Sequence, residues 1–419
     1  MTRPTFRSTL RRTRGPAVAL AALLALTACG SRVDTASTTS AAAGGSGSVP
    51  GAAAAGCVDT SGDSVKIGFL NSLSGTMAIS EKTVHDSLQM AADEINAAGG
   101  VNGKTLDVIT EDGASEPTVF AEKAEKLIKS DCVAAVFGGW TSASRKAMLP
   151  VFEGNNSLLY YPVQYEGLEA SKNIFYTGAT TNQQIVPALD YLKEQGVTSL
   201  FLVGSDYVFP RTANKIIKAY AAANGIEIKG EEYTPLGDTE FSTIVNKVQA
   251  SGADAVFNTL NGDSNVAFFK QYRNVGLTPE TMPVVSVSIA EEEVGGIGLD
   301  NVVGQLAAWN YFQTIDTPVN KKFVPMEAAY TSLYLWKLMA EKAKAFDTAS
   351  IQAAADGITF DAPEGTVVVD GANHHISKTA LIGKIGPDGL LYTEWSSPAP
   401  IQPDPFLTGY PWAAGLATG

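Results

Sequence analysis

Three tyrosines and a glutamine stand within six positions of the stretch YYPVQYEG, residues 160–167. Tyr160 and Tyr161 follow an apolar run, and Gln164 and Tyr165 come shortly after the next proline. Phenol rings can form a wall that excludes water while their hydroxyls pair with polar hydrogens, and a glutamine amide both donates and accepts. These residue types suit the binding of a small polar molecule. Alternation along the preceding strand assigns the Tyr160 ring to the core.

A second polar group follows the apolar run 133–139, in the sequence GGWTSASRK. Ser142 comes two residues after Trp140, where we expect a helix to begin. At such a position free backbone N–H groups and a serine hydroxyl can serve a carbonyl oxygen. Trp140, Thr141 and Ser142 are therefore ligand-binding candidates. The alternative is that Thr141 or Ser142 only caps the helix.

Further candidates follow later apolar runs. Tyr207 lies in GSDYVFPR, Asp263 in LNGDSN, and Ser288 and Glu291 in SVSIAEEE. A carboxylate in such a loop can accept N–H bonds from a ligand, and a hydroxyl can donate or accept. The alternative for these acids, and for Asp206, is an ordinary solvated surface charge.

Short β-rich runs alternate with helical-period stretches along most of the chain. The first four β-rich runs are 65–70, 106–112, 133–139 and 157–162. Between the first two lies a helical stretch with its apolar face at Val84, Leu88, Ala91 and Ile95, ended by Gly99 and Gly100. The alternation restarts after Gly178, with β-rich runs at 199–206, 226–233, 253–260 and 282–288.

This repeated alternation predicts an α/β protein with two lobes, each a doubly wound parallel sheet covered on both faces and joined by a hinge. In open parallel sheets, ligands collect beyond the carboxyl ends of the strands. The candidate residues all follow predicted strands. We therefore expect their loops to line one cleft between the lobes.

The N-terminal segment reads as an export signal. Five arginines precede the ten-residue apolar run 17–26, which is too short to span a bilayer as a helix. The four residues from Leu26 to Cys29 resemble a bacterial lipobox, which implies cleavage after residue 28 and acylation of Cys29. The protein is then extracytoplasmic and anchored to the cell membrane. The alternative is an ordinary secretory signal with an incidental cysteine.

Charge excludes some partners. Cleavage before Cys29 removes five arginines and no acid from a chain of formal charge −13, which leaves −18. Such an acidic protein is a poor partner for nucleic acid or an anionic lipid surface. Membrane contact is expected through the lipid anchor alone.

Two further cysteines, Cys57 and Cys132, invite a disulfide in an exported protein. Each precedes a predicted strand, and these two strands should be parallel neighbours with their amino ends at one edge of the first lobe. The alternative is a pair of unrelated thiols.

Three stretches carry a family resemblance: FGGWTSASRKAMLPVFE, LLYYPVQYEGLEASKNIFYTGATTNQQ and VGSDYVFPRTANK. They resemble the urea and short-chain amide branch of the type I periplasmic binding proteins, related to the branched-chain amino acid receptors. The resemblance extends from Val65 to about Phe406. It implies a receptor subunit of an ABC importer that closes two lobes on one small molecule and works with permease subunits. It also implies that Ser142, Tyr161 and Tyr207 face the ligand, whereas Val163 and Gln164 depart from the pattern.

Urea suits these residues, since it offers one carbonyl acceptor and several N–H donors on an uncharged frame. The alternatives are a receptor for another short-chain amide or for branched-chain amino acids and, more remotely, an amide hydrolase. No nucleophile elbow, phosphate loop or zinc-protease helix occurs in the sequence, so we expect neither an enzyme nor a cofactor. The adjacent His374 and His375 lack further ligands at metal spacing and are expected in a solvated turn rather than a metal site.

The predicted organisation has six parts. They are a signal peptide (1–28), a tether rich in small polar residues (29–64), the first part of lobe 1 (65–178), the first part of lobe 2 (179–312), return helices of lobe 1 (313–355), and return strands of lobe 2 with the C-terminal tail (356–419).

Overall fold

The computed structural model describes residues 57–317, 319–320 and 326–418. The predicted signal peptide, Cys29 and the tether up to residue 56 lie outside the described residues. Within them, no helix combines the length and the apolar character that a membrane span requires.

The first lobe is built on a sheet with the strand order β11-β12-β13-β5-β4-β3-β1-β2. Its strands are β1 (Ser64–Asn71), β2 (Thr105–Asp112), β3 (Val136–Gly138), β4 (Leu159–Tyr161), β5 (Ile174–Tyr176), β11 (Thr359–Ala362), β12 (Gly365–Asp370) and β13 (His375–Ile376). Within the sheet, the six neighbouring strands β13, β5, β4, β3, β1 and β2 pair in parallel. β12 and β11 are added to β13 in antiparallel pairing at one edge.

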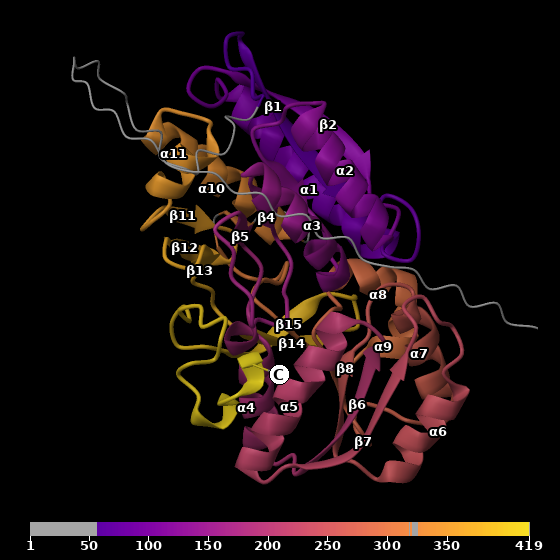
Figure 1. Ribbon diagram of the computed structural model, residues 1–419. Helices are drawn as coiled ribbons and strands as arrows, with labels where there is room; N and C mark the ends of the chain where they lie inside the picture. Colours follow the sequence, from indigo (N-terminus) through magenta and orange to yellow (C-terminus); the bar gives the residue numbers. More distant parts are fainter. Residues whose placement is uncertain (1–56, 318, 321–325, 419) are drawn as a thin grey trace, which may run out of the picture. The chain divides into compact units, whose positions relative to one another are not determined.

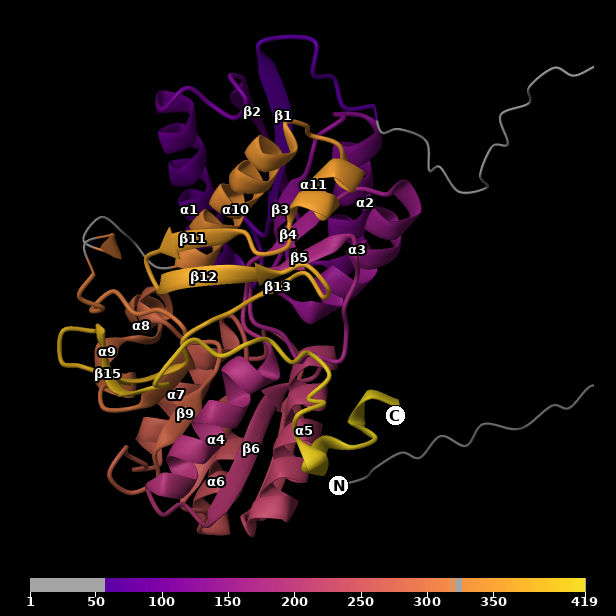
Figure 2. The same cartoon turned by 90° about the vertical axis from the view of Figure 1, so that its left-hand side faces the viewer.

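Helices cover both faces of this sheet (Figure 2). α1 (Ala78–Ala97) and α10 (Glu327–Ala343) contact each other on one face, and α2 (Pro117–Lys129) and α3 (Ser142–Asn155) contact each other on the opposite face. α11 (Thr348–Ala354) packs beside α10. This arrangement explains why the strands are apolar on both sides, with β3, β4 and β5 completely buried.

The second lobe repeats the design, with strands in the order β15-β14-β10-β9-β8-β6-β7. The strands are β6 (Ser199–Ser205), β7 (Glu227–Thr234), β8 (Ala255–Thr259), β9 (Val284–Ser286), β10 (Leu306–Trp309), β14 (Leu381–Ile385) and β15 (Leu391–Ser396). The helices are α4 (Ile185–Glu194), α5 (Val208–Asn224), α6 (Ser242–Ser251), α7 (Ser264–Asn274), α8 (Glu291–Ile297) and α9 (Leu299–Val302). In Figure 1, α4 and α5 lie on one side of β6 to β8, and α6 and α7 on the other. The predicted α/β class with two largely parallel sheets is confirmed.

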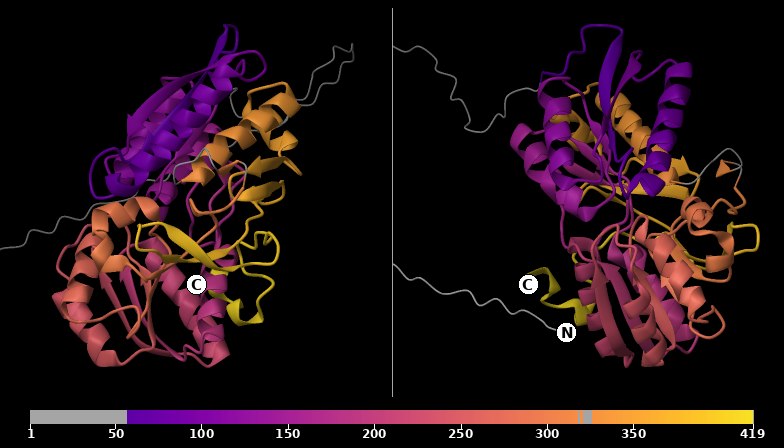
Figure 3. Two further views of the ribbon diagram at one scale, coloured as in Figure 1. Left: turned by 180° about the vertical axis from the view of Figure 1, so that it is seen from behind. Right: turned by 90° about the vertical axis from the view of Figure 1, so that its right-hand side faces the viewer.

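The chain returns to the first lobe with α10 and α11, within the predicted range 313–355, but it stays there longer than the sequence indicated. β11, β12 and β13 belong to the first sheet, where β13 pairs with β5 through His375 and Tyr176. Only β14 and β15, drawn in yellow in Figure 3, join the second sheet. The expectation that all of 356–419 belongs to lobe 2 does not match this strand order. Strand pairing is non-local, so a β-rich tail alone does not indicate which sheet it extends.

Tyr160 lies in the core of the first lobe, as predicted from alternation. Its ring is buried and stacks between Phe137 and Phe175, with centroid separations of 5.0 and 4.8 Å. Trp336 of α10 packs edge-on against Phe137 at 5.9 Å. These rings join the middle strands of the sheet to α10.

His374 and His375 are buried, so the expectation of a solvated turn is wrong. His374 stacks on Phe175 and His375 on Tyr176, at 4.2 and 4.3 Å between ring centroids. Burial lowers the pKa of His375 to about 3, so the ring is neutral at physiological pH. The pairing of β13 with β5 brings both imidazoles onto aromatic faces, which the local sequence does not reveal.

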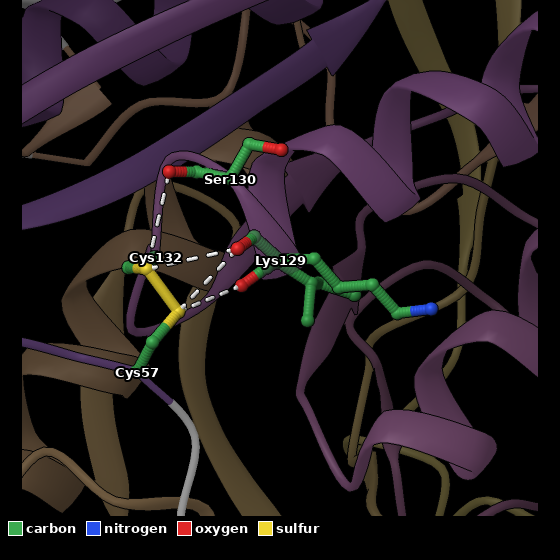
Figure 4. The surroundings of a disulfide bond; sticks show 5 residues. Cys57, Lys129, Ser130 and Cys132 are labelled. Atoms are coloured by element: carbon green, nitrogen blue, oxygen red, sulfur yellow. Dashed lines mark hydrogen bonds between the residues drawn. A yellow bond between two sulfur atoms is a disulfide. The ribbon is translucent and has the colours of Figure 1, made fainter.

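A disulfide joins Cys57 to Cys132 at the amino-terminal edge of the first sheet. β1 and β3 are parallel neighbours, as the sequence argument required. The bridge lies beside the end of α2, next to the backbone of Lys129 and Ser130 (Figure 4). It ties Cys57, the first described residue, to the loop that enters β3.

Candidate functional site

Loops from the carboxyl ends of the two sheets contact each other directly. Trp140 Nε1 donates to Asn261 Oδ1 at 3.2 Å. Gln164 Nε2 donates to the Val287 carbonyl at 2.8 Å and to Ser288 Oγ at 3.2 Å. These hydrogen bonds join the loops after β3 and β4 to those after β8 and β9. The predicted candidate loops therefore do face one another across the two lobes.

The loop after β3 begins at a glycine that the geometry requires. Gly138 has φ +126°, and a Cβ atom there would lie 2.3 Å from the Leu70 carbonyl oxygen of the neighbouring strand. The chain then passes through buried Trp140 to Thr141, which caps α3 by accepting from the Ser144 backbone N–H at 3.1 Å. Thr141 thus has the capping role that the sequence left open between Thr141 and Ser142.

Ser142 belongs to a buried polar network that the sequence did not indicate. Its hydroxyl donates to Glu166 Oε2 and accepts from Arg145 Nη1 at 2.9 Å. Arg145 also donates through Nε to Glu169 Oε1 at 2.8 Å and through Nη2 to Glu166 Oε1 at 3.0 Å. The Arg145 side chain is fully buried. The one available signal was spacing, since Ser142 and Arg145 are three positions apart on one helix face.

Tyr161 completes the wall of the first lobe. Its hydroxyl donates to the Trp140 carbonyl, and the Arg145 guanidinium carbon lies 5.1 Å from the ring centroid. The ring of Tyr165 also lies near this guanidinium, at 4.6 Å from its carbon, and the Tyr165 hydroxyl bonds His375 Nε2 at 2.6 Å. The tyrosines of this stretch therefore have two roles: Tyr160 packs the core, whereas Tyr161 and Tyr165 contact a buried arginine.

Tyr207 enters from the second lobe at the start of α5. It borders a depression of about 430 Å³ that is also lined by Thr76, Thr141 and Ala143 of the first lobe. Burial raises the pKa of Tyr207 well above its usual value, and the nearby Tyr161 and Glu166 add to the shift. The structure thus brings Tyr207 near the predicted residues of α3 and β4.

Gln164, Ser288 and Glu291 lie together at a second position, beside a cavity of about 40 Å³. Gln164 and Glu291 line it together with Pro162, Gly178, Ala179, Ala290, Trp309, Asn310, Tyr311, Met326, Glu327, Ala328 and Lys378. Gln164 Oε1 and Glu291 Oε2 are buried and have no hydrogen-bond partner among the described residues. The other Glu291 oxygen accepts from the Gln313 backbone N–H at 2.9 Å. Two residues from opposite lobes, each with an unpaired buried oxygen, therefore line one small cavity.

Asp263 does not join either group. Its side chain is exposed and does not cap α7, and only its backbone N–H reaches the first lobe, donating to the Thr76 carbonyl at 3.2 Å. Asp206 is likewise exposed and pairs with Arg211. These two carboxylates have the surface positions that were the alternative reading of the sequence.

Acidic groups dominate the buried charge around the cleft. Glu81 of α1 accepts from the Ser72 backbone N–H at 2.6 Å, and burial raises the pKa of Glu81 to about 8. Burial also raises the pKa of Glu291. The buried cations are already paired: Arg145 with Glu166 and Glu169, and Lys378 with Glu364. Among the described residues, no cluster of histidine, cysteine or acidic side chains is arranged to hold a metal ion.

Residues 65–411 match the periplasmic binding protein domain family. The Leu/Ile/Val-binding protein homolog 6 of Brucella melitensis is 24% identical over 371 residues, which cover 82% of this chain and 94% of the relative. A solute binding protein of an ABC transporter from Rhodopseudomonas palustris HaA2, solved with p-hydroxybenzoic acid, is 25% identical with a TM-score of 0.73, over 81% of this chain and 98% of that one.

A branched-chain amino acid transporter substrate binding protein from Streptococcus pneumoniae, solved with isoleucine, shares the fold. Its TM-score is 0.71 at 22% identity, over 81% of this chain and all of that one. Two parallel sheets whose carboxyl edges face each other match this two-lobed architecture. The chain belongs to the type I periplasmic binding proteins, the extracytoplasmic substrate-binding components of ABC transporters.

Proposed function

We propose that the protein binds urea, or a closely related short primary amide, between its two lobes and delivers it to an ABC importer. The observation that carries this proposal is the cavity of about 40 Å³ lined by Gln164 and Glu291, each of which has a buried side-chain oxygen without a partner among the described residues. A buried acceptor without a donor costs about 1–3 kcal/mol. A ligand that presents N–H groups to both oxygens recovers that energy.

The charge of the site favours a neutral ligand. A carboxylate ligand needs a cation or several free donors, but Arg145 and Lys378 are held by acids of the protein. Glu291 and Glu327 both line the cavity and would repel a carboxylate group. An amide has no net charge and carries more N–H donors than acceptors when it is as small as urea.

The size of the cavity points the same way. A space of about 40 Å³ accommodates only a few water-sized groups. A benzene ring or a branched aliphatic side chain needs a larger cavity, so the aromatic acid and isoleucine of the structural relatives fit poorly without rearrangement. Ser288 joins this surface through its hydrogen bond with Gln164. Five further predicted residues do not line the cavity, and we propose that they contribute from the neighbouring loops: Trp140, Thr141, Ser142, Tyr161 and Tyr207.

The proposed cellular setting follows from the N-terminal sequence. Lipidation of Cys29 would hold the protein at the outer surface of the cell membrane, next to the permease subunits. Acyl chains anchor with about 0.8 kcal/mol for each buried methylene. The short polar segment before Cys57 would let the lobes reach the transporter.

Calorimetry tests the ligand. Urea, formamide and acetamide are titrated into the protein, with leucine and 4-hydroxybenzoate as the competing ligand classes. A ceiling of about 1.5 kcal/mol per non-hydrogen atom limits urea to about 6 kcal/mol, a Kd of some tens of micromolar. Gln164→Ala and Glu291→Ala should each weaken urea binding, while exposed Asp263→Ala serves as the control.

If leucine or 4-hydroxybenzoate gives a heat of binding and no amide does, the amide proposal is wrong and the ligand belongs to one of the classes bound by the relatives. Equal urea affinity in Gln164→Ala, Glu291→Ala and the control would show that urea does not bind at this cavity. Ammonia release from urea or acetamide would instead indicate an amide hydrolase.

A further inference from the structure

α1 of the first lobe and α8 of the second lobe are packed against each other. At Gly296 of α8, a Cβ atom would lie 2.5 Å from Cδ1 of Ile79 in α1. Gly296 lies inside α8 and does not have a left-handed backbone conformation. The backbone conformation at residue 296 therefore does not require glycine. A side chain at this position would have to displace Ile79 of the first lobe.

The neighbouring glycine has no such constraint. Gly295 is in the same helix, is also exposed, and a Cβ atom there would meet no atom within 4 Å. The two glycines thus share helix, exposure and intrinsic helix propensity. They differ in one respect, the contact of residue 296 with Ile79.

A polar pair lies at the same contact. The Glu293 carboxyl faces Ser80 of α1, and its Oε2 accepts from the Ala290 backbone N–H at 2.8 Å. The Glu293 side chain is buried, with Glu291 and Glu292 as its charged neighbours, and burial raises the pKa of Glu293 to about 7. The contact therefore combines a close apolar fit with a buried acid.

We propose that this α1–α8 contact is a latch that holds the two lobes closed in the ligand-free protein, with Gly296 and Ile79 as its fitted pair. Neither residue lines the cavity, so the latch does not depend on which ligand the cleft takes. It changes affinity indirectly. When a smaller fraction of the molecules is in the closed, binding-competent arrangement, the apparent affinity for the ligand is lower.

Hydrogen exchange with matched variants tests the latch. Leucine is introduced at each glycine in turn, since the tip of Ile79 can turn away from a methyl group but not from a full side chain. Exchange of the peptides that contain residues 78–81 and 291–297 is followed without ligand. Gly296→Leu should lose at least tenfold protection in both peptides, and Gly295→Leu should keep it.

Removal of the opposing side chain provides the rescue. Ile79→Ala in the Gly296→Leu background should restore most of the protection, because space for the leucine returns. Equal exchange in the two leucine variants, or a loss confined to the α8 peptide, would overturn the latch. So would the absence of rescue by Ile79→Ala.

Urea calorimetry on the same variants separates this inference from the proposed ligand. If urea binds the parent, Gly296→Leu should weaken binding about threefold to tenfold, and Gly295→Leu should leave it unchanged. Equal affinities despite a difference in exchange would refute the effect of the latch on binding. If no variant and no parent binds urea, the ligand proposal fails, while exchange still decides the latch.

Discussion

Arg145 donates to the hydroxyl of Ser142 at 2.9 Å from one helical turn away, with its guanidinium completely buried. The same guanidinium pairs with Glu166 and Glu169. One arginine thereby ties α3 to the loop that carries Gln164, the residue that reaches across to the second lobe. The loop position that the proposed amide site requires depends on a charge network inside the first lobe.

Arg145→Met should therefore be strongly destabilising. It leaves Glu166 and Glu169 buried without their main cation, a change that costs about 3–5 kcal/mol in comparable buried pairs. Thermal unfolding at neutral pH measures the loss as a lowered Tm. Arg211→Met is the control, because Arg211 pairs with Asp206 at the surface and its removal should leave Tm nearly unchanged. Equal Tm values in both variants would contradict a structural role for the buried network.

Ser142→Ala and Tyr207→Phe should each weaken urea binding by about 1–3 kcal/mol, since each removes a polar partner from a desolvated site. Tyr160→Phe should bind urea like the parent, because that hydroxyl contacts only Met339 Sδ at 3.2 Å among the described residues. Calorimetry on the three variants provides the measurement. Unchanged binding in both Ser142→Ala and Tyr207→Phe would exclude this wall from the site.

Glu81 should make the folded state less stable as the pH rises from about 5 to 8. Its pKa in the folded protein is raised to about 8, so the folded state retains a proton that the unfolded chain releases near its ordinary pKa. Stability then falls by about 1.4 kcal/mol per pH unit within this window and levels off above it. Glu81→Gln should flatten the dependence of Tm on pH. A parallel shift of the whole profile would assign the dependence to other groups.

The disulfide should add about 4 kcal/mol, because it closes a loop with a sequence separation of 75 residues. Cys57→Ser together with Cys132→Ser should lower Tm without changing urea affinity, as the bridge lies at the edge of the sheet away from the cleft loops. Thiol titration of unfolded, non-reduced protein gives an independent measurement. Two reactive thiols would show that the bond does not form in the isolated protein.

Cys29→Ala should release the protein from the membrane fraction and leave ligand affinity unchanged. The expected reason is the loss of the acylated residue that follows the predicted cleavage position. Fractionation of cells that express the variant, followed by calorimetry on the released protein, measures both effects. Retention of the variant in the membrane fraction would argue for another anchor.

Several features followed from the sequence because they depend on local patterns. The alternation of β-rich and helical stretches predicted the α/β class, and strand alternation placed the Tyr160 ring in the core. The helix start at GGWTSASRK was visible from its residues, although Thr141 rather than Ser142 provides the cap. The general rule for parallel sheets then brought the candidate loops to facing edges.

Tertiary structure decided the features that depend on distant partners. Burial of Arg145 is stable only because Glu166 and Glu169 come from another loop, and hydropathy alone assigns an arginine to the surface. His374 and His375 are buried where β13 pairs between β12 and β5 of the first sheet. Gln164 reaches Val287, and Gly296 lies close to Ile79, because residues of the two lobes meet there. Local sequence determines which strands and helices form, whereas pairing between segments more than a hundred residues apart determines which side chains share a cavity.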